Sequence, residues 1–236
     1  MTLAAILSVI FLGAFTQGVT GFGNALVVVP LLSFLLPLQV VVPLTILNGL
    51  VITSFLSYRM RGQVVSRRIA PLMLGCLPGV GAGTLLLHRL PTAGLRTMLG
   101  LVLIAYVLWH YHGKPRRTVG EGWAYLAGFA TGLIGACLSA GGPPTIIYTT
   151  LTGWDKDEIK ATLSGFFLFT GITIGLTHWL TGAATAEVHQ LFLYSLPVVL
   201  GGVAAGAGLY DRINGELYRR LLLCGLLIMG VLFLLP

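Results

Sequence analysis

Polar side chains and glycines gather at two places in an otherwise apolar chain, and their types suit the binding of a small oxyanion. The candidate substrate-binding residues are Gln17, Thr20, Gly21, Gly23, Asn24 and Asn48 at the first place, and Ser139, Gly141, Gly142, Thr145, Tyr148 and Ser164 at the second. None of these side chains is ionised at neutral pH. We therefore expect the positive partner of an anion to be the backbone N–H groups at a helix start, which carries roughly half an elementary charge.

Both places interrupt long uncharged segments. Residues 122–154 give 33 uncharged positions, too many for one membrane span and too few for two with a loop. The sequence Gly141-Gly142-Pro143-Pro144 in this segment ends any continuous helix. Residues 3–36 have a similar centre, so each segment is predicted to contain a half-helix, a break and a second half-helix. We expect backbone donors at 21–25 and 139–145, with Asn24 and Ser139 as capping residues.

The elements that position these residues must lie in a bilayer. Of 236 residues only 9% are charged, against about 25% in a soluble domain, and the mean hydropathy is +0.93. This composition excludes a soluble globular fold and predicts an all-α polytopic membrane protein surrounded by lipid. The 14 basic residues lie mostly in short loops, where they set topology. No nucleic-acid partner is therefore expected.

An internal repeat organises the chain. Gly18, Gly21 and Pro30 align with Gly132, Gly135 and Pro144 at a constant offset of 114. The predicted repeats are 1–113 and 114–236, each a broken or re-entrant helical hairpin plus three transmembrane helices. The predicted spans are 41–58, 69–88, 97–112, 160–180, 191–210 and 218–236.

Loop charges orient these segments. If both broken segments crossed the membrane, the basic residues would divide seven to seven, without a positive-inside bias. A re-entrant hairpin at 122–152 changes the division to twelve against two. The basic loops 59–68, 113–121, 153–160 and 211–220 then face the cytoplasm, both termini lie outside, and the two repeats are inverted copies in the cell's inner membrane. Residues 155–160, which include Lys160, are interpreted as a solvated helix start.

Inverted repeats with broken helices are typical of secondary transporters, whose substrate sites form at the breaks. The chain has no ATP-binding, dinucleotide-binding or hydrolase motif and no convergent titratable groups, so no enzyme activity, cofactor or metal site is expected. The expected partners are a small anionic substrate and membrane lipid.

Three segments carry a resemblance to a known family. GVTGFGNALVVVPLL (18–32), LTILNGLVITSFLSYR (44–59) and TGLIGACLSAGGPPTIIY (131–148) resemble the TauE/SafE family of sulfite-exporter or 4-toluene-sulfonate-uptake permeases. The resemblance covers essentially the whole chain and implies transport of small sulfur-containing anions such as sulfite or organosulfonates, usually outward. Family members often show GxGGG at the breaks. Here the bulkier Asn24 and Ser139 interrupt that pattern and bear on the choice of substrate.

Two alternatives stay open at this point. One is a proton-coupled permease of another small organic anion, although all seven acidic residues lie at loops or helix ends. The other is a membrane assembly protein that transports nothing. The sequence also leaves open the anion, the direction of transport, the coupling ion, the oligomeric state and whether segment 3–36 crosses the membrane or re-enters.

Overall fold

The computed structural model of the chain is helical, and it describes residues 2–63, 66–87, 97, 100–101, 103–108, 110, 118–138, 141–180 and 185–234. The helices within these ranges are α1 (Thr2–Thr20), α2 (Asn24–Leu32), α3 (Leu38–Arg59), α4 (Ser66–Leu87), α6 (Trp123–Leu138), α7 (Gly142–Leu151), α8 (Lys156–Leu180), α9 (Ala186–Tyr210) and α10 (Gly215–Leu234). Residues 103–108 are also helical.

Five of these helices are long and apolar enough to cross a membrane. The candidate spans are Leu3–Thr20, Gln39–Arg59, Lys156–Leu176, Ala186–Tyr210 and Gly215–Leu234. The prediction of an all-α polytopic membrane protein is therefore confirmed. The predicted span 97–112 lies partly outside the described residues.

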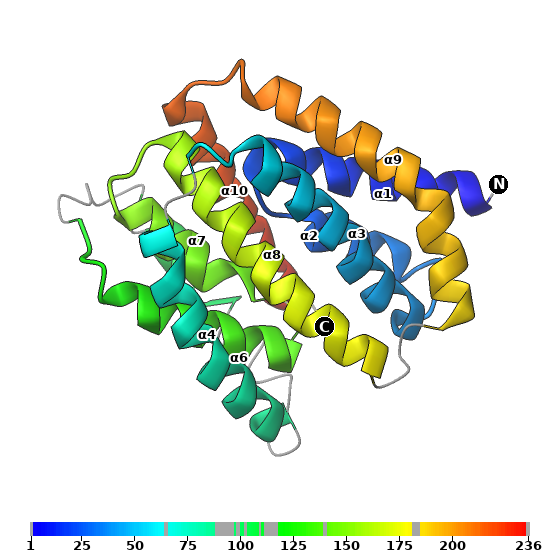
Figure 1. Cartoon of the computed structure of the whole chain (residues 1–236), viewed down its shortest axis with the longest axis horizontal. Coiled ribbons are helices and arrows are strands. Elements are labelled where there is room, and N and C mark those ends of the chain that lie inside the picture. Colours follow the sequence, from blue (N-terminus) through cyan, green and yellow to red (C-terminus); the bar gives the residue numbers. More distant parts are fainter. Residues whose placement is uncertain are drawn as a thin grey trace. The chain divides into compact units, whose positions relative to one another are not determined.

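The first broken segment is a hairpin with unequal arms. α1 has 19 residues, which is about 28 Å of helix, whereas α2 has only 9. The first arm of the hairpin, α1, is thus longer than the half-helix expected from the sequence. A Cβ atom on Gly13 of α1 would lie 2.7 Å from Asn24 Oδ1 and 2.4 Å from a methyl carbon of Val28. Because these contacts join the middle of α1 to the first two turns of α2, α2 folds back along α1 (Figure 1).

Helix contacts divide the chain into two compact units. Unit 1 contains residues 1–64 and 160–213, and unit 2 contains residues 65–159 and 214–236. In unit 1, α1, α2, α3 and α9 enclose an apolar core that includes Ile10, Leu32, Leu44, Ile52 and Val199, all fully buried. Helix α8 belongs to both units, with residues 156–159 in unit 2 and the rest in unit 1.

Glycines allow one very close helix crossing in each unit. In unit 1, α1 and α9 lie side by side (Figure 1), and a Cβ on Gly202 or Gly206 would lie 2.8 or 2.2 Å from the carbonyl oxygen of Phe11 or Phe15. In unit 2, a Cβ on Gly75 or Gly79 of α4 would lie 2.1 or 2.2 Å from the carbonyl oxygen of Tyr125 or Phe129 of α6. Backbone therefore packs on backbone in both crossings. Because residue numbers rise together along both helices of each pair, the two helices run in the same direction.

The two crossings have the same residue spacing. Phe11 and Phe15 precede Tyr125 and Phe129 by 114 positions, and Gly75 and Gly79 precede Gly202 and Gly206 by 127. A third contact follows the same rule, since Gly18 approaches the Val203 carbonyl and Gly132 approaches that of Cys76. The offset of 114 that relates α1 to α6 in sequence thus also relates their contacts.

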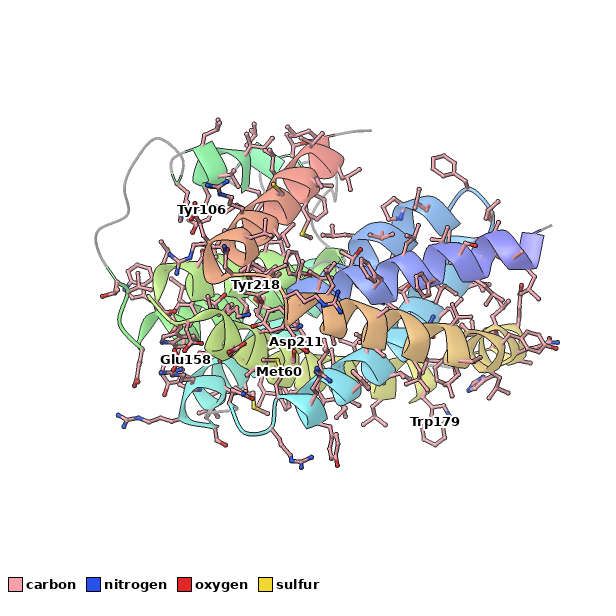
Figure 2. The ribbon with its side chains drawn as sticks, turned by 90° about the horizontal axis from the view of Figure 1, so that it is seen from above. Met60, Tyr106, Glu158, Trp179, Asp211 and Tyr218 are labelled. Carbon is pink, nitrogen blue, oxygen red and sulfur yellow. The ribbon has the colours of Figure 1, made fainter. Side chains whose placement is uncertain are left out.

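A surface ion pair joins the C-terminus of α3 to that of α9 in unit 1. Arg59 Nη2 lies 2.5 Å from Asp211 Oδ2, and both side chains are about half exposed. Figure 2 labels Asp211 beside Met60, the residue that caps α3. Near the C-terminus of α8, Trp179 projects away from the helices (Figure 2) and is 66% exposed. An exposed tryptophan at the end of a span suits the membrane interface.

Candidate functional site

The first break is a three-residue turn between α1 and α2. Gly21 and Gly23 adopt φ angles of 83° and 102°, a left-handed backbone conformation in which a Cβ atom is strained. The Thr20 hydroxyl stabilises the turn, since it lies 2.5 Å from the Phe22 carbonyl oxygen and 3.3 Å from the Phe22 nitrogen. The buried Gln17 contributes its backbone carbonyl oxygen, which accepts a hydrogen bond from the Gly21 N–H at 2.7 Å. These contacts fix the path of the backbone between the two helices.

The start of α2 has no side-chain cap. Gly23 is the N-cap, and the described residues show no side-chain capping hydrogen bond at this helix start. Asn24 is the first helical residue, so the sequence-based expectation that Asn24 caps this helix is wrong. The first N–H groups of α2, at residues 24–26, have no acceptor within the helix. Of the donors predicted at 21–25, residues 24 and 25 belong to this group, whereas the N–H groups of Gly21 and Phe22 donate to Gln17 and Thr20 within the turn.

Asn24 and Asn48 bring buried amides to the interior of unit 1. Asn24 Nδ2 donates to the Thr45 carbonyl oxygen at 3.3 Å. Its Oδ1 faces Gly13 and accepts no hydrogen bond from the described part of the chain. A Cβ on Gly49 would lie 3.9 Å from Asn24 Nδ2. The Asn24 amide therefore lies against the turn of α3 that carries Thr45, Asn48 and Gly49.

Asn48 is fully buried and pairs with Ser195 of α9. The Ser195 hydroxyl lies 2.9 Å from both Asn48 Oδ1 and the Phe192 carbonyl oxygen. A hydroxyl has one hydrogen, so it donates to only one of these acceptors at a time. When it donates to Asn48, Asn48 Nδ2 has no partner. When it donates to Phe192, the Asn48 amide can be turned so that Nδ2 donates to the Ser195 oxygen. The Asn48 oxygen then has no hydrogen-bond partner. Either orientation leaves one buried polar atom of Asn48 unsatisfied.

Helix α8 adds two buried polar residues one helical turn apart. Ser164 is fully buried, and its Oγ has no hydrogen-bond partner among the residues that the structure describes. Lys160 is only 1% exposed, and its Nζ donates to the Gly18 carbonyl oxygen at 2.5 Å. The interpretation of Lys160 as part of a solvated helix start is therefore wrong. Its burial also brings a cation to unit 1, where the sequence suggested that backbone N–H groups alone supply positive charge.

The second break differs in its donors. Gly141 is the N-cap of α7, again without a side-chain cap, and Pro143 and Pro144 stand in the first turn. Proline has no N–H, so two of the backbone donors expected in 139–145 do not exist. A Cβ on Gly141 would lie 2.5 Å from the Thr131 carbonyl oxygen. This glycine therefore allows α7 to pack on α6, and Ser139, the expected cap, lies outside the described residues.

The polar side chains of the second break pair with each other or with aromatic rings. Thr145 Oγ1 lies 2.7 Å from Thr131 Oγ1, and both residues are buried. Tyr148 is 5% exposed and packs edge-on against Trp154 at 5.8 Å between ring centroids. The two threonine hydroxyls thus satisfy each other within unit 2, in contrast to the unsatisfied amides of unit 1.

The predicted site residues thus fall into two groups. Unit 1 holds Gln17, Thr20, Gly21, Gly23, Asn24, Asn48 and Ser164, and unit 2 holds Gly141, Gly142, Thr145 and Tyr148. The sequence-based list missed Lys160, Thr45 and Ser195. For Lys160 a signal existed, since positions 160 and 164 are one helical turn apart and share a face of the helix.

Comparison with known proteins identifies a family. The family model described as sulfite exporter TauE/SafE matches residues 6–233, which is nearly the whole chain and includes both breaks. No curated protein and no solved structure matches. Helix breaks, apolar spans and the family match agree with one another, and the chain belongs to the TauE/SafE family of membrane transporters.

Proposed function

We propose that this transporter exports a small sulfur-containing anion, such as sulfite or an organosulfonate, by alternating access around its helix breaks. Four buried side-chain atoms in the described part of unit 1 have no hydrogen-bond partner, and two of them, Asn48 Nδ2 and the Ser164 hydroxyl, are donors that carry the proposal. An unsatisfied buried polar atom costs about 1–3 kcal/mol. In the orientation that leaves Asn48 Nδ2 free, a bound oxyanion removes that cost, because its oxygens accept hydrogen bonds from Nδ2 and from the Ser164 hydroxyl.

The start of α2 supports the same assignment. Its N–H groups at residues 24–26 are uncapped by any side chain, and helix N-termini favour anions. The first break offers three such N–H groups, whereas Pro143 and Pro144 remove two from the second. The first break is therefore the stronger anion-binding element.

Outward transport is favoured energetically. An anion leaving a cell that is negative inside gains about 2.3 kcal/mol per charge per 100 mV. Export therefore requires no coupled ion, whereas uptake requires one. The proposed location is the inner membrane, with the basic segments 59–68, 113–121, 153–158 and 211–220 on the cytoplasmic side.

The proposed architecture consists of two inverted copies, residues 1–113 and 114–236. The equal spacing of the glycine contacts in the two units supports this division. Each crossing pairs a first hairpin helix with a helix from the other half of the chain, since α1 packs on α9 and α6 packs on α4.

The test is flux in proteoliposomes with a controlled membrane potential, using sulfite, sulfoacetate, sulfate and small carboxylates. Wild-type protein should move the sulfur anions down their electrical gradient. Ser164→Ala should weaken affinity by about threefold to thirtyfold, the equivalent of one hydrogen bond or somewhat more to a charged ligand. The same variant should be at least as stable as wild type without substrate, because it removes an unsatisfied hydroxyl.

Thr53→Val is the matched control. Its hydroxyl is also buried but bonds within its own helix, to the Gly49 carbonyl oxygen at 2.8 Å, so affinity should not change. Wild-type protein that moves none of these anions, or a Ser164→Ala variant with wild-type affinity, would contradict the proposal.

A further inference from the structure

Lys160 is a buried cation inside a candidate membrane span. It lies in Lys156–Leu176, and its Nζ is 3.5 Å from the centroid of the Tyr210 ring as well as 2.5 Å from the Gly18 carbonyl oxygen. These contacts join three helices of unit 1, namely α8, α1 and α9. Charged groups inside a membrane span are costly and are usually functional. The position of Lys160 therefore requires a reason beyond packing.

The carbonyl that Lys160 contacts belongs to the end of α1 at the first break. Gly18 is among the last four residues of α1, whose carbonyl groups carry about half a negative charge. The start of α2, across the turn formed by residues 21–23, carries about half a positive charge. The two helix ends therefore oppose each other at the break. An anion would meet a repulsive carbonyl end beside an attractive N–H end.

We propose that Lys160 makes the first break selective for anions by compensating the carbonyl end of α1. This inference rests on the proposed function of the break as a substrate site. Whatever else the ammonium contacts, replacing it by a neutral group makes the local charge more negative by one unit. That change lowers affinity for an anion and leaves affinity for a neutral molecule of the same shape nearly unchanged. Lys160 thus acts as a specificity-determining residue through the α1 terminus.

The selected substrate class is a small oxyanion, and a neutral isostere separates charge from shape. Methanesulfonate and methanesulfonamide are such a pair, since the amide replaces one charged oxygen with a neutral nitrogen group. Binding of each to purified protein, together with sulfite flux, gives an anion-to-neutral affinity ratio. A purely structural role for Lys160 would change both affinities together, whereas charge selection changes the ratio.

The first comparison removes the charge. Lys160→Gln should lower the affinity for methanesulfonate by about tenfold or more while methanesulfonamide binds as in wild type, and Lys160→Arg should keep the wild-type ratio. Lys156→Gln is the matched control, because it removes the same charge from the same helix one turn earlier and from a side chain that is not buried. Its ratio should equal that of wild type.

The second comparison keeps Lys160 in place, in case its removal prevents folding. Ser164→Asp places a carboxylate one helical turn from the ammonium, and Ser164→Asn has the same shape without the charge. The Asp variant should lose the preference for methanesulfonate relative to the Asn variant.

Two results would overturn the inference, and they have different meanings. If wild type binds and moves anions but Lys160→Gln or Ser164→Asp keeps the wild-type ratio, Lys160 does not select charge although the site is an anion site. If wild type neither binds methanesulfonate nor moves sulfite or sulfoacetate, the proposed function fails and the inference fails with it.

Discussion

Adding one methyl group to either glycine crossing should destabilise the protein to the same extent. In both Gly206→Ala and Gly79→Ala the new Cβ would lie 2.2 Å from a carbonyl oxygen, of Phe15 and Phe129 respectively. Carbon–oxygen contacts normally lie near 3.3–3.6 Å, so each helix pair must separate by about 1 Å. Overpacking of this kind costs about 1–3 kcal/mol, and the higher end applies here because the clash is with backbone.

The control positions lie two residues away on the same helices. A Cβ on Gly208 of α9 or Gly81 of α4 would meet nothing within 4 Å. Alanine at these positions should therefore leave stability unchanged or raise it by up to about 1 kcal/mol, through its higher helix propensity. Each test variant and its control thus differ only in what the same methyl group meets.

Thermal unfolding in detergent, followed by loss of monodisperse protein on size-exclusion chromatography, measures the difference. Gly206→Ala and Gly79→Ala should unfold several degrees below wild type, while Gly208→Ala and Gly81→Ala should not. Substrate affinity of the test variants, measured on the folded fraction, should change less than stability. Equal melting temperatures for test and control variants would refute the backbone-on-backbone packing. A loss at only one crossing would refute the equivalence of the two units.

Three further predictions concern the break, the surface and the topology. Gly23→Val should lower both transport and stability, the latter by about 1–2 kcal/mol, because a β-branched residue is strained at a φ of 102°. Transport and melting assays on one preparation measure both effects. A fully stable variant would contradict the left-handed turn. Asp211→Asn should change stability by no more than about 1 kcal/mol, and by less at high salt, since the ion pair of Asp211 with Arg59 is half exposed. A double-mutant cycle with Arg59→Gln measures the coupling energy of the pair. A much larger coupling energy would mean that the pair is shielded from solvent. Cysteines placed within 153–158 and 113–121 should both be labelled from the cytoplasm and a C-terminal reporter should be external, so labelling on opposite faces would exclude the re-entrant hairpin.

Composition and glycine positions were sufficient to predict much of the fold. The low charge content predicted helices in lipid, and Gly21 and Gly23 marked the turn where the structure has positive φ angles. These features are local, because a glycine-rich turn needs no distant partner. The prolines at 143 and 144 were equally local, and the absence of their N–H groups was readable from the sequence.

The buried charge at Lys160 was not predictable from a one-dimensional charge pattern. Its neighbours Asp155, Lys156 and Asp157 are typical of a solvated helix start, and the contacts of the Lys160 ammonium with Gly18 of α1 and Tyr210 of α9 exist only in the folded chain. The pairing of Ser195 with Asn48 was hidden for the same reason. Their separation along the chain gives no sequence signal, and the contact exists only once α9 packs on α3.

The two glycine crossings also set an order for biosynthesis. Gly132 reaches its partner Cys76 soon after it is made, since α4 already precedes α6 in the chain, whereas Phe15 has no counterpart until Gly206 has been synthesised. At about 5–20 residues per second, that wait lasts roughly ten to forty seconds. During this interval the face of α1 that α9 later covers is in the membrane without its intended neighbour. Insertion factors or lipids must occupy it, and a chain truncated before α9 should be a target for membrane quality control.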